Sequence, residues 1–522
     1  MSHETTTSRW ITRSFALLFV AATPFASGCP EPTDATSQKE CTAEGQKTAK
    51  KWMKRAGDDY KSGDLDDAND SITSAVNGCP SDGEIRLMAA RIALARLDFK
   101  GALGALENVD GSEAASLRAR AYWYSDDLTH TAEELSAALE DPDFKDPWAK
   151  PVRELAGTQG SGRHPFQLRE GSARLVEMHM PRDLGYALML PIEIDGQSTM
   201  ALAVTGVPEV ILDSKTRTNP GWVSVKFGTA DRWMEYRDVP ALVNDLTPYT
   251  ASQQVPIGAL IGVNFLRRLH LTFDRRGDQF IIRKEEPPPP PAFTRVPVAY
   301  VRGGGMIVRG TLKKEFEITS GLWVNTGDPF TLALPDPTWK KLGVDPSTLP
   351  TYASLAHGKL TDVRIGGLDL GPVESVAGIS GIEDKLSQID VDVVGAMGVG
   401  FLTAMRVTIA DGGRALWLET DEDTSMVLAP PVPTSGSVSA PPPVPTANSS
   451  AAPATTTTAP PNPTTTSTAT TTTVAPTPKS TATTTAAPTV TAAPPIKPKP
   501  AVAPTPKASA VPTAKPAPAS SK

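Results

Sequence analysis

Apolar residues follow two different patterns along this chain of 522 residues. From Glu44 to about Gly157 the pattern is that of helices, whereas from Arg163 to Glu419 the apolar residues form short runs that end at glycine turns, as strands do. From Pro430 onward the chain is almost wholly Pro, Thr, Ala and Ser. We therefore predict a multidomain protein, with an all-α domain over 41–158, a mainly-β region over 163–421 and a disordered tail over 429–522.

Small and large apolar residues recur in the helical segment with a period of 34 residues. Residues 49–80 fit one unit of this period, and two looser units follow. The matching positions are Trp52, Gly63, Ala68, Ile72, Ala75 and Pro80, then Ala90, Phe99, Ala102 and Leu106, then Ala121, Ala132 and Leu139. This pattern resembles tetratricopeptide repeats. The resemblance implies either an array that binds a partner protein on its concave face or a spacer that docks the neighbouring domain, and the sequence leaves both open.

Two sequence blocks occur in the same order in each half of the β region. The first is an apolar run that contains Thr-Gly, at Ala201–Leu212 and again at Leu322–Leu334. The second covers Gly258–Phe273 and Gly395–Ile409. Its aligned pairs are Gly262 with Gly398, Phe265 with Phe401 and Leu266 with Leu402. The sequence therefore predicts a duplicated lobe, with a stiff connector at 286–292 that contains five prolines.

This duplication resembles the pepsin and retropepsin superfamily, in which each lobe carries an apolar-Asp-Thr-Gly loop and, later, an apolar-Gly-x-x-Phe-Leu turn. The resemblance covers about half of the chain and implies a two-lobed acid-peptidase-like domain, with lobe 1 over 163–285 and lobe 2 over 293–421. An unrelated duplicated β sandwich is the alternative for the same pattern.

The residues on which the family relies for catalysis are replaced. Val204 and Asn325 occupy the two aspartate slots. In the family two facing aspartates share one proton and activate a water, but valine has no polar atom and asparagine has no titratable proton near neutral pH. The loop residues that the resemblance retains are Thr205 and Thr326, as braces, and Gly206 and Gly327, which permit the tight turns.

Other residues near these blocks are weaker candidates. Asp328 directly follows the second Thr-Gly, and Asp213 ends the strand after the first loop, but we interpret both as solvated turn residues. Trp233, Met234 and Tyr236 lie where the family has its flap. They are predicted either to cover a bound peptide or to form an ordinary packed hairpin.

A basic segment, an apolar stretch and a cysteine follow one another near the N-terminus. Arg9 and Arg13 precede the apolar stretch, residues 15–25, which is too short to span a bilayer as a stable helix. Small residues then stand directly before Cys29, and this layout resembles a bacterial lipoprotein signal with its lipobox. This resemblance implies removal of 1–28, acylation of Cys29 and a linker over 29–40, whereas ordinary signal cleavage is the alternative.

The two remaining cysteines, Cys41 and Cys79, are an even number in an exported chain, so we expect one disulfide between them. Two unpaired buried thiols are the alternative.

Charge and composition exclude several functions. The formal net charge is −7, and because the tail contributes six lysines and no acid, the rest of the chain is more acidic than this total. An acidic body argues against nucleic acid as a partner. The six histidines are scattered and no Cys-x-x-Cys occurs, so neither a metal nor another cofactor is predicted.

Together these patterns predict a lipid-anchored protein of the bacterial cell envelope that faces the periplasm or the surface. Its degenerate peptidase-like domain is expected to bind a protein or an extended peptide, because a strand-pairing groove holds peptides through backbone hydrogen bonds. The alternatives are an active aspartic endopeptidase with a rearranged site and a structural scaffold that acts through its helical repeats. The sequence specifies neither the ligand nor the oligomeric state.

Overall fold

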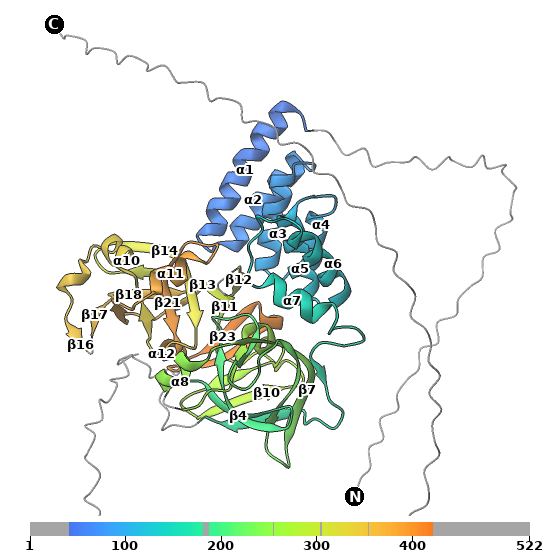
Figure 1. Cartoon of the computed structure of the whole chain (residues 1–522). Coiled ribbons are helices and arrows are strands. Elements are labelled where there is room, and N and C mark those ends of the chain that lie inside the picture. The colour runs from blue at the N-terminus through green and yellow to red at the C-terminus, as the bar shows by residue number, and fades with distance from the viewer. Residues whose placement is uncertain (1–40, 181–186, 254, 303–304, 353, 421–522) are drawn as a thin grey trace, which may run out of the picture. The chain divides into compact units, whose positions relative to one another are not determined.

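The computed structural model describes residues 41–180, 187–253, 255–302, 305–352 and 354–420 (Figure 1). The predicted signal, the lipobox cysteine Cys29, the linker 29–40 and the tail 429–522 lie outside these residues. The predicted fold class is confirmed, since a helical region comes first and a mainly-β region follows it. None of the helices in the described ranges combines the length and the apolar character that crossing a bilayer requires.

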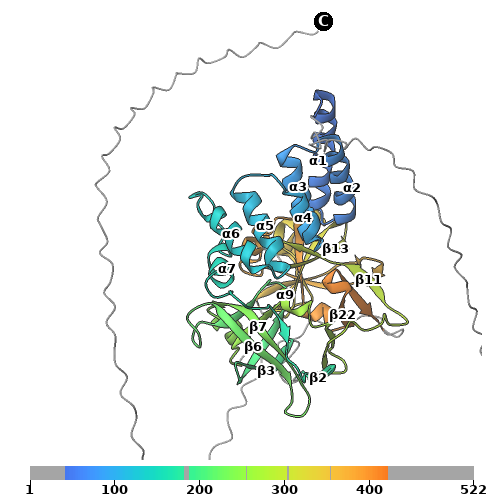
Figure 2. The ribbon, with the colours of Figure 1, turned by 90° about the vertical axis from the view of Figure 1, so that its right-hand side faces the viewer.

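Helices α1 to α7 form the N-terminal region and stack as successive antiparallel neighbours (Figures 1 and 2). Their bounds are α1 Ala43–Lys61, α2 Leu65–Gly78, α3 Gly83–Ala95, α4 Phe99–Ala105, α5 Ser112–Tyr124, α6 Leu128–Leu139 and α7 Ala149–Ala156. Aspartates cap the N-termini of α2, α3, α4 and α6 because each carboxylate accepts a backbone N–H of the first turn. A disulfide joins Cys41, before α1, to Cys79, after α2, with a Cα–Cα distance of 5.0 Å.

Lobe 1 contains a seven-stranded sheet in the order β1-β7-β5-β8-β4-β3-β6, which closes on itself because β6 also pairs with β7. The elements from residue 167 to 283 are β1 Gln167–Leu168, β2 Leu175–His179, β3 Met189–Ile194, β4 Gln197–Val204, β5 Val210–Asp213, β6 Gly221–Gly228, β7 Trp233–Asn244, α8 Thr247–Gln253, β8 Ala259–Gly262, α9 Val263–Leu266, β9 Thr272–Asp274 and β10 Gln279–Arg283.

Lobe 2 is built on a ten-stranded sheet that centres on β21, β14 and β13. The elements from residue 294 to 419 are β11 Thr294–Pro297, β12 Ala299–Val301, β13 Gly305–Lys313, β14 Glu317–Asn325, β15 Leu332–Ala333, α10 Asp336–Lys341, β16 Thr351–Tyr352, β17 Leu355–Lys359, β18 Asp362–Ile365, β19 Leu368–Asp369, β20 Glu374–Ala377, α11 Ile382–Ser387, β21 Val393–Gly398, α12 Val399–Leu402, β22 Arg406–Ala410 and β23 Ala415–Glu419. Two short 3-10 turns occur at Pro346–Thr348 and Asp411–Gly413.

The two duplicated blocks are neighbours in space within each lobe. In lobe 1, β4 runs parallel to β8 and pairs Val204 with Gly262. In lobe 2, β14 runs parallel to β21 and pairs Asn325 with Gly398. A Cβ on either of these glycines would lie 2.1 Å from a backbone carbonyl oxygen, so both positions need the absence of a side chain. The equivalent registers explain why the two motifs recur together.

A third, six-stranded sheet joins the lobes, in the order β11-β23-β22-β9-β10-β2. Its central pair is β9 of lobe 1 with β22 of lobe 2, and Thr272 lies directly opposite Thr408. Their hydroxyl oxygens are 2.8 Å apart and buried. These residues occupy equivalent positions in the two second blocks, so the pair marks the meeting of the duplicated halves.

Candidate functional site

The two Thr-Gly loops meet and brace each other through their threonines. The Thr205 hydroxyl donates to the carbonyl oxygen of Val324 at 2.8 Å and accepts the backbone N–H of Thr326 at 3.2 Å. Reciprocally, the Thr326 hydroxyl donates to the carbonyl oxygen of Ala203 at 2.7 Å and accepts the backbone N–H of Thr205 at 3.0 Å. Both side chains are buried. This threonine brace therefore ties lobe 1 to lobe 2 where the two Thr-Gly loops meet.

The side chains at the aspartate slots both point toward the opposite loop. Asn325 is buried, and a Cβ placed on Gly206 would lie only 2.5 Å from its Oδ1 atom. Val204 is fully buried, and a Cβ on Gly327 would lie 3.2 Å from its Cγ1 atom. Neither glycine has a positive φ. Both glycines lie in turns, and the close approach of the opposite loop, rather than a left-handed backbone, is what requires glycine there.

Asp328 is bound to Asn325 rather than solvated. The Asn325 amide nitrogen donates to an Asp328 carboxylate oxygen at 2.6 Å, and Asn325 Oδ1 accepts the backbone N–H of Gly327 at 3.2 Å. Burial raises the pKa of the Asp328 carboxyl above the ordinary aspartate value. The interpretation of Asp328 as a solvated turn residue is wrong, because the Asn325 amide draws it toward the loop pair. The same interpretation is wrong for Asp213, which is buried and accepts the backbone N–H groups of Lys215, in its own turn, and of Leu246, 33 residues later.

Large side chains flank the loop pair. Trp323 lies two residues before Asn325 in β14 and so faces the same side of the sheet. Its ring would be 2.7 Å from a Cβ on Gly206, and it belongs to a buried cluster that includes Tyr60 of α1. Tyr249 of α8 packs in the cluster that holds Val204. The sequence prediction missed both residues, although the period of two along β14 would have placed Trp323 on the side of Asn325.

The three residues predicted at the flap lie in or against the core of lobe 1. Met234 and Tyr236 are buried, and the Tyr236 ring meets Phe265 edge-on with 5.2 Å between centroids. Burial raises the pKa of Tyr236 to about 12. Trp233 is half-buried beneath the guanidinium of Arg169. Met234 and Tyr236 therefore bury apolar area in the core of lobe 1, which favours the alternative of a packed hairpin for these two residues.

The helical region is bound to lobe 1 through a buried carboxylate. Glu209 follows the first Thr-Gly loop, and one of its oxygens accepts the indole N–H groups of Trp123 at 3.1 Å and Trp148 at 3.2 Å. Asn264 approaches the other oxygen at 3.5 Å. Burial raises the pKa of Glu209, while these three hydrogen bonds act in the opposite direction. Because the donors come from both regions, Glu209 is part of the contact between the helices and lobe 1.

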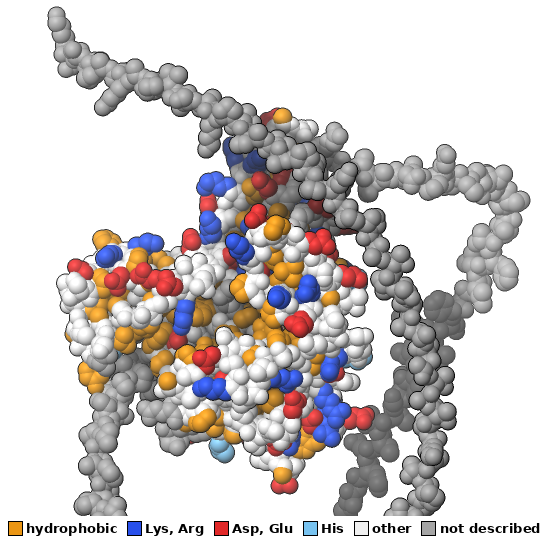
Figure 3. Space-filling view, viewed as in Figure 1, with side chains coloured by type: hydrophobic (Ala, Val, Ile, Leu, Met, Phe, Trp, Pro, Cys, Tyr) orange, Lys and Arg blue, Asp and Glu red, His pale blue; other side chains and the backbone are white. Residues whose placement is uncertain are grey.

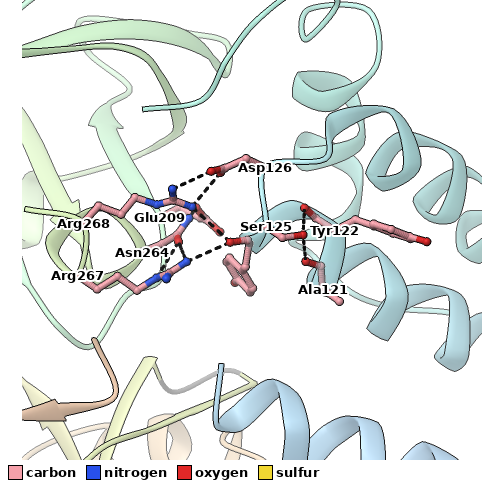
Figure 4. Close-up of polar contacts among 9 residues, drawn as sticks. Ala121, Tyr122, Ser125, Asp126, Glu209, Asn264, Arg267 and Arg268 are labelled. Atoms are coloured by element: carbon pink, nitrogen blue, oxygen red, sulfur yellow. Dashed lines mark hydrogen bonds and ion pairs between the residues drawn. The ribbon is translucent and has the colours of Figure 1, made fainter. Parts of the chain in front are cut away.

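Two adjacent arginines after α9 hold the C-terminal end of α5 (Figure 4). Arg267 and Arg268 each donate to the carbonyl oxygen of Tyr124, at 3.2 and 3.3 Å. Arg268 also forms a bidentate ion pair with Asp126, with both distances 2.8 Å. Burial, together with the neighbouring Arg268, lowers the pKa of Arg267 to about 10. Cations at the end of a helix are favourable because unpaired carbonyls carry partial negative charge there.

The helical region also contacts lobe 2. The Tyr60 hydroxyl donates to Asp390 at 3.2 Å, and the backbone N–H of Asp392 donates to the carbonyl oxygen of Lys61 at 2.8 Å. Arg309 forms an ion pair with Asp64. The first helix of each pair, α1, α3 and α5, therefore supplies side chains that face the lobes. This arrangement favours the hypothesis of a docked array over that of a free concave face.

A cavity of about 80 Å³ remains between α1, α3, α5 and the two lobes. Apolar side chains and arginines line it, among them Leu94, Leu117, Arg120 and Arg302. Pockets that hold drug-sized ligands measure roughly 300 Å³ or more. The cavity is thus too small for an extended peptide. Within the described ranges, no three His, Cys, Asp or Glu side chains gather as metal ligands would.

Comparison with known proteins found solved structures that match parts of this chain at low TM-scores. No protein-family model matches the chain, and no curated protein matches it. The first TPR domain of Spaghetti, solved with an HSP90 peptide, is 18% identical over 21% of this chain and 91% of its own, with a TM-score of 0.20. A retropepsin-like aspartic protease from Rickettsia conorii is 21% identical over 24% of this chain and 91% of its own, with a TM-score of 0.18. An aspartic proteinase from Irpex lacteus is 10% identical over 48% of this chain and 99% of its own, with a TM-score of 0.31.

Proposed function

We propose that this chain is a lipid-anchored protein of the bacterial cell envelope whose peptidase-like lobes bind or organise a partner and do not hydrolyse peptides. One observation carries the proposal. The threonine brace of the loop pair is complete, but the residues that it positions, Val204 and Asn325, cannot exchange the proton that peptide hydrolysis requires. The hydrogen bonds that hold the two loops together are thus present, whereas the side chains that would catalyse hydrolysis are absent.

The surroundings of the loop pair support the same proposal. An attacking water would have to lie between two carboxyl groups. Here a valine side chain and an amide stand where those two carboxyl groups would be. Trp323 packs beside Gly206, and Tyr249 lies in the Val204 cluster. The protein's own side chains therefore compete with a substrate for the space around the loops.

A proteolysis assay tests the absence of catalysis. The purified chain should cleave neither an unfolded protein nor a peptide library between about pH 3 and 7, the range in which paired carboxylates titrate. The double variant Val204→Asp with Asn325→Asp should also remain inactive, because Trp323 still fills the space beside Gly206. Val204→Asn is the matched control, since it adds a polar group that does not ionise. Pepstatin-sensitive cleavage by the unmodified chain would contradict the proposal.

Asp328 favours a second candidate, an aspartic endopeptidase with a rearranged site. Its carboxyl is hydrogen-bonded to Asn325, and burial raises its pKa, as expected for a general acid or base. This carboxyl has an amide as its neighbour where the family has a second carboxyl. The proteolysis assay distinguishes the candidates, because activity that Asp328→Asn abolishes and Asp213→Asn preserves would establish the second one.

The partner class that we propose is a protein. Side chains on α1, α3 and α5, including Tyr60, Arg120 and Tyr124, already face the lobes, so a partner of the helical region would bind elsewhere on its surface. Cutting the helices away from the lobes would expose Trp123 and Trp148, which are buried in the whole chain. Binding experiments therefore need the helices and lobes together.

A further inference from the structure

Helix α1 carries a stripe of basic side chains along its exposed face. Lys47, Lys50, Lys51 and Lys54 follow one another at helical spacings of three, one and three, and Arg55 extends the stripe. All five side chains are exposed, whereas the opposite face of the helix is buried through Ala49, Ala56 and Tyr60. Figure 3 shows Lys and Arg side chains, in blue, in the region of α1.

The N-terminal part of the stripe has no acidic partner within the described ranges. Lys54 pairs with Asp58 at 2.8 Å and Arg55 with Asp59 at 3.5 Å, but Lys47, Lys50 and Lys51 form no ion pair there. Three uncompensated charges thus lie within two turns of the helix. The disulfide from Cys41 to Cys79 holds this end of α1 against α2, so the stripe is presented on a fixed surface.

An aromatic side chain borders the stripe. Trp52 is 37% exposed, which makes it one of three large hydrophobic side chains with substantial exposure in the described part of the chain. The guanidinium of Arg55 lies 5.7 Å from the centre of its ring. Lysine and arginine beside an exposed tryptophan are the composition of helices that lie in a membrane interface, because the ring suits the headgroup region and the charges attract anionic lipids.

We propose that the exposed face of α1 docks on an anionic phospholipid surface. The inference rests on the membrane anchoring in the proposed function, since Cys29 precedes α1 by 14 residues, which span at most about 50 Å when fully extended. The whole chain has a formal charge of −7, so most of its surface is repelled by such a membrane and the basic stripe sets the orientation. One acyl chain alone gives only marginal attachment, and a basic patch supplies the second signal.

Vesicle binding without the acyl group tests this proposal. A chain of residues 30–522 keeps every described residue and lacks the proposed acylation site. It should sediment with vesicles that contain about one third phosphatidylglycerol in phosphatidylcholine but not with pure phosphatidylcholine vesicles, and binding should weaken as salt rises from about 0.1 to 0.5 M. The variant Lys47→Gln, Lys50→Gln, Lys51→Gln should partition about a hundredfold less, because each lysine near an anionic surface contributes about fivefold.

A matched variant controls for net charge. Lys100→Gln, Lys145→Gln, Lys150→Gln removes three exposed lysines that lie outside α1 in the same helical region and should change partitioning by less than about twofold. Equal losses in both variants, or equal binding to neutral and anionic vesicles, would overturn the proposal. The lipid anchor is tested separately, because this assay contains no acylated protein.

Discussion

The threonine brace offers the sharpest test of how the two lobes are held together. Thr205→Val keeps the size and the β-branched shape of the side chain but removes the hydroxyl. The buried N–H of Thr326 and the carbonyl of Val324 then each lose a hydrogen bond. Leaving a buried polar group unsatisfied costs about 1–3 kcal/mol, so we expect the free energy of unfolding to fall by about 2–4 kcal/mol.

The pseudo-symmetry of the site makes the prediction more specific. Thr326→Val removes the equivalent two hydrogen bonds, to Thr205 N–H and to the Ala203 carbonyl, and should cost the same amount within about 1 kcal/mol. The double variant removes all four bonds. Because the residues are in contact, its cost should differ measurably from the sum of the two single costs.

Urea unfolding followed by tryptophan fluorescence measures these effects as a shift of the midpoint. Thr311→Val is the control, since Thr311 shares a 2.9 Å hydrogen bond with Thr319 at an exposed position and should change stability by less than about 0.5 kcal/mol. A midpoint for Thr205→Val that coincides with that of Thr311→Val would refute the conclusion that the brace holds the lobes together.

Two further predictions concern the buried carboxylate and the N-terminus. Because burial raises the pKa of Glu209, the folded state holds this proton more tightly than the unfolded state, so the contribution of this group to stability should fall as pH rises above the ordinary glutamate range. Glu209→Gln should flatten this dependence in pH-resolved thermal unfolding, whereas Glu193→Gln, in a surface ion pair with Lys226, should not. If Cys29 is acylated, the protein should incorporate a fatty-acid analogue and partition into detergent, and Cys29→Ser should abolish both. Unchanged membrane association of that variant would contradict the lipid anchor.

Local patterns were enough to predict the fold class. Apolar spacing distinguishes helix from strand because the two backbones repeat every 3.6 and every 2 residues, and this separated the helical region from the lobes. The duplication was visible because glycine stands at the same place in both halves, at Gly262 and Gly398. Only glycine fits there, since a Cβ at either position would lie 2.1 Å from a carbonyl oxygen. The absence of an aspartate before either Thr-Gly pair, where Val204 and Asn325 stand, was equally plain from the sequence.

What each buried face contacts was decided only by the tertiary structure. Periodicity marks Tyr236 as a residue of one strand face, but only the folded lobe shows that this face packs on Phe265. From the sequence alone, Glu209 has the character of an ordinary surface residue. Only the folded structure shows that it is buried and accepts the indole N–H of Trp123, 86 positions earlier in the chain. The physical reason is that these contacts join segments far apart in the chain, and their partners are set by packing rather than by local spacing. The same holds for the contact between Trp323 and Gly206, which joins the two lobes.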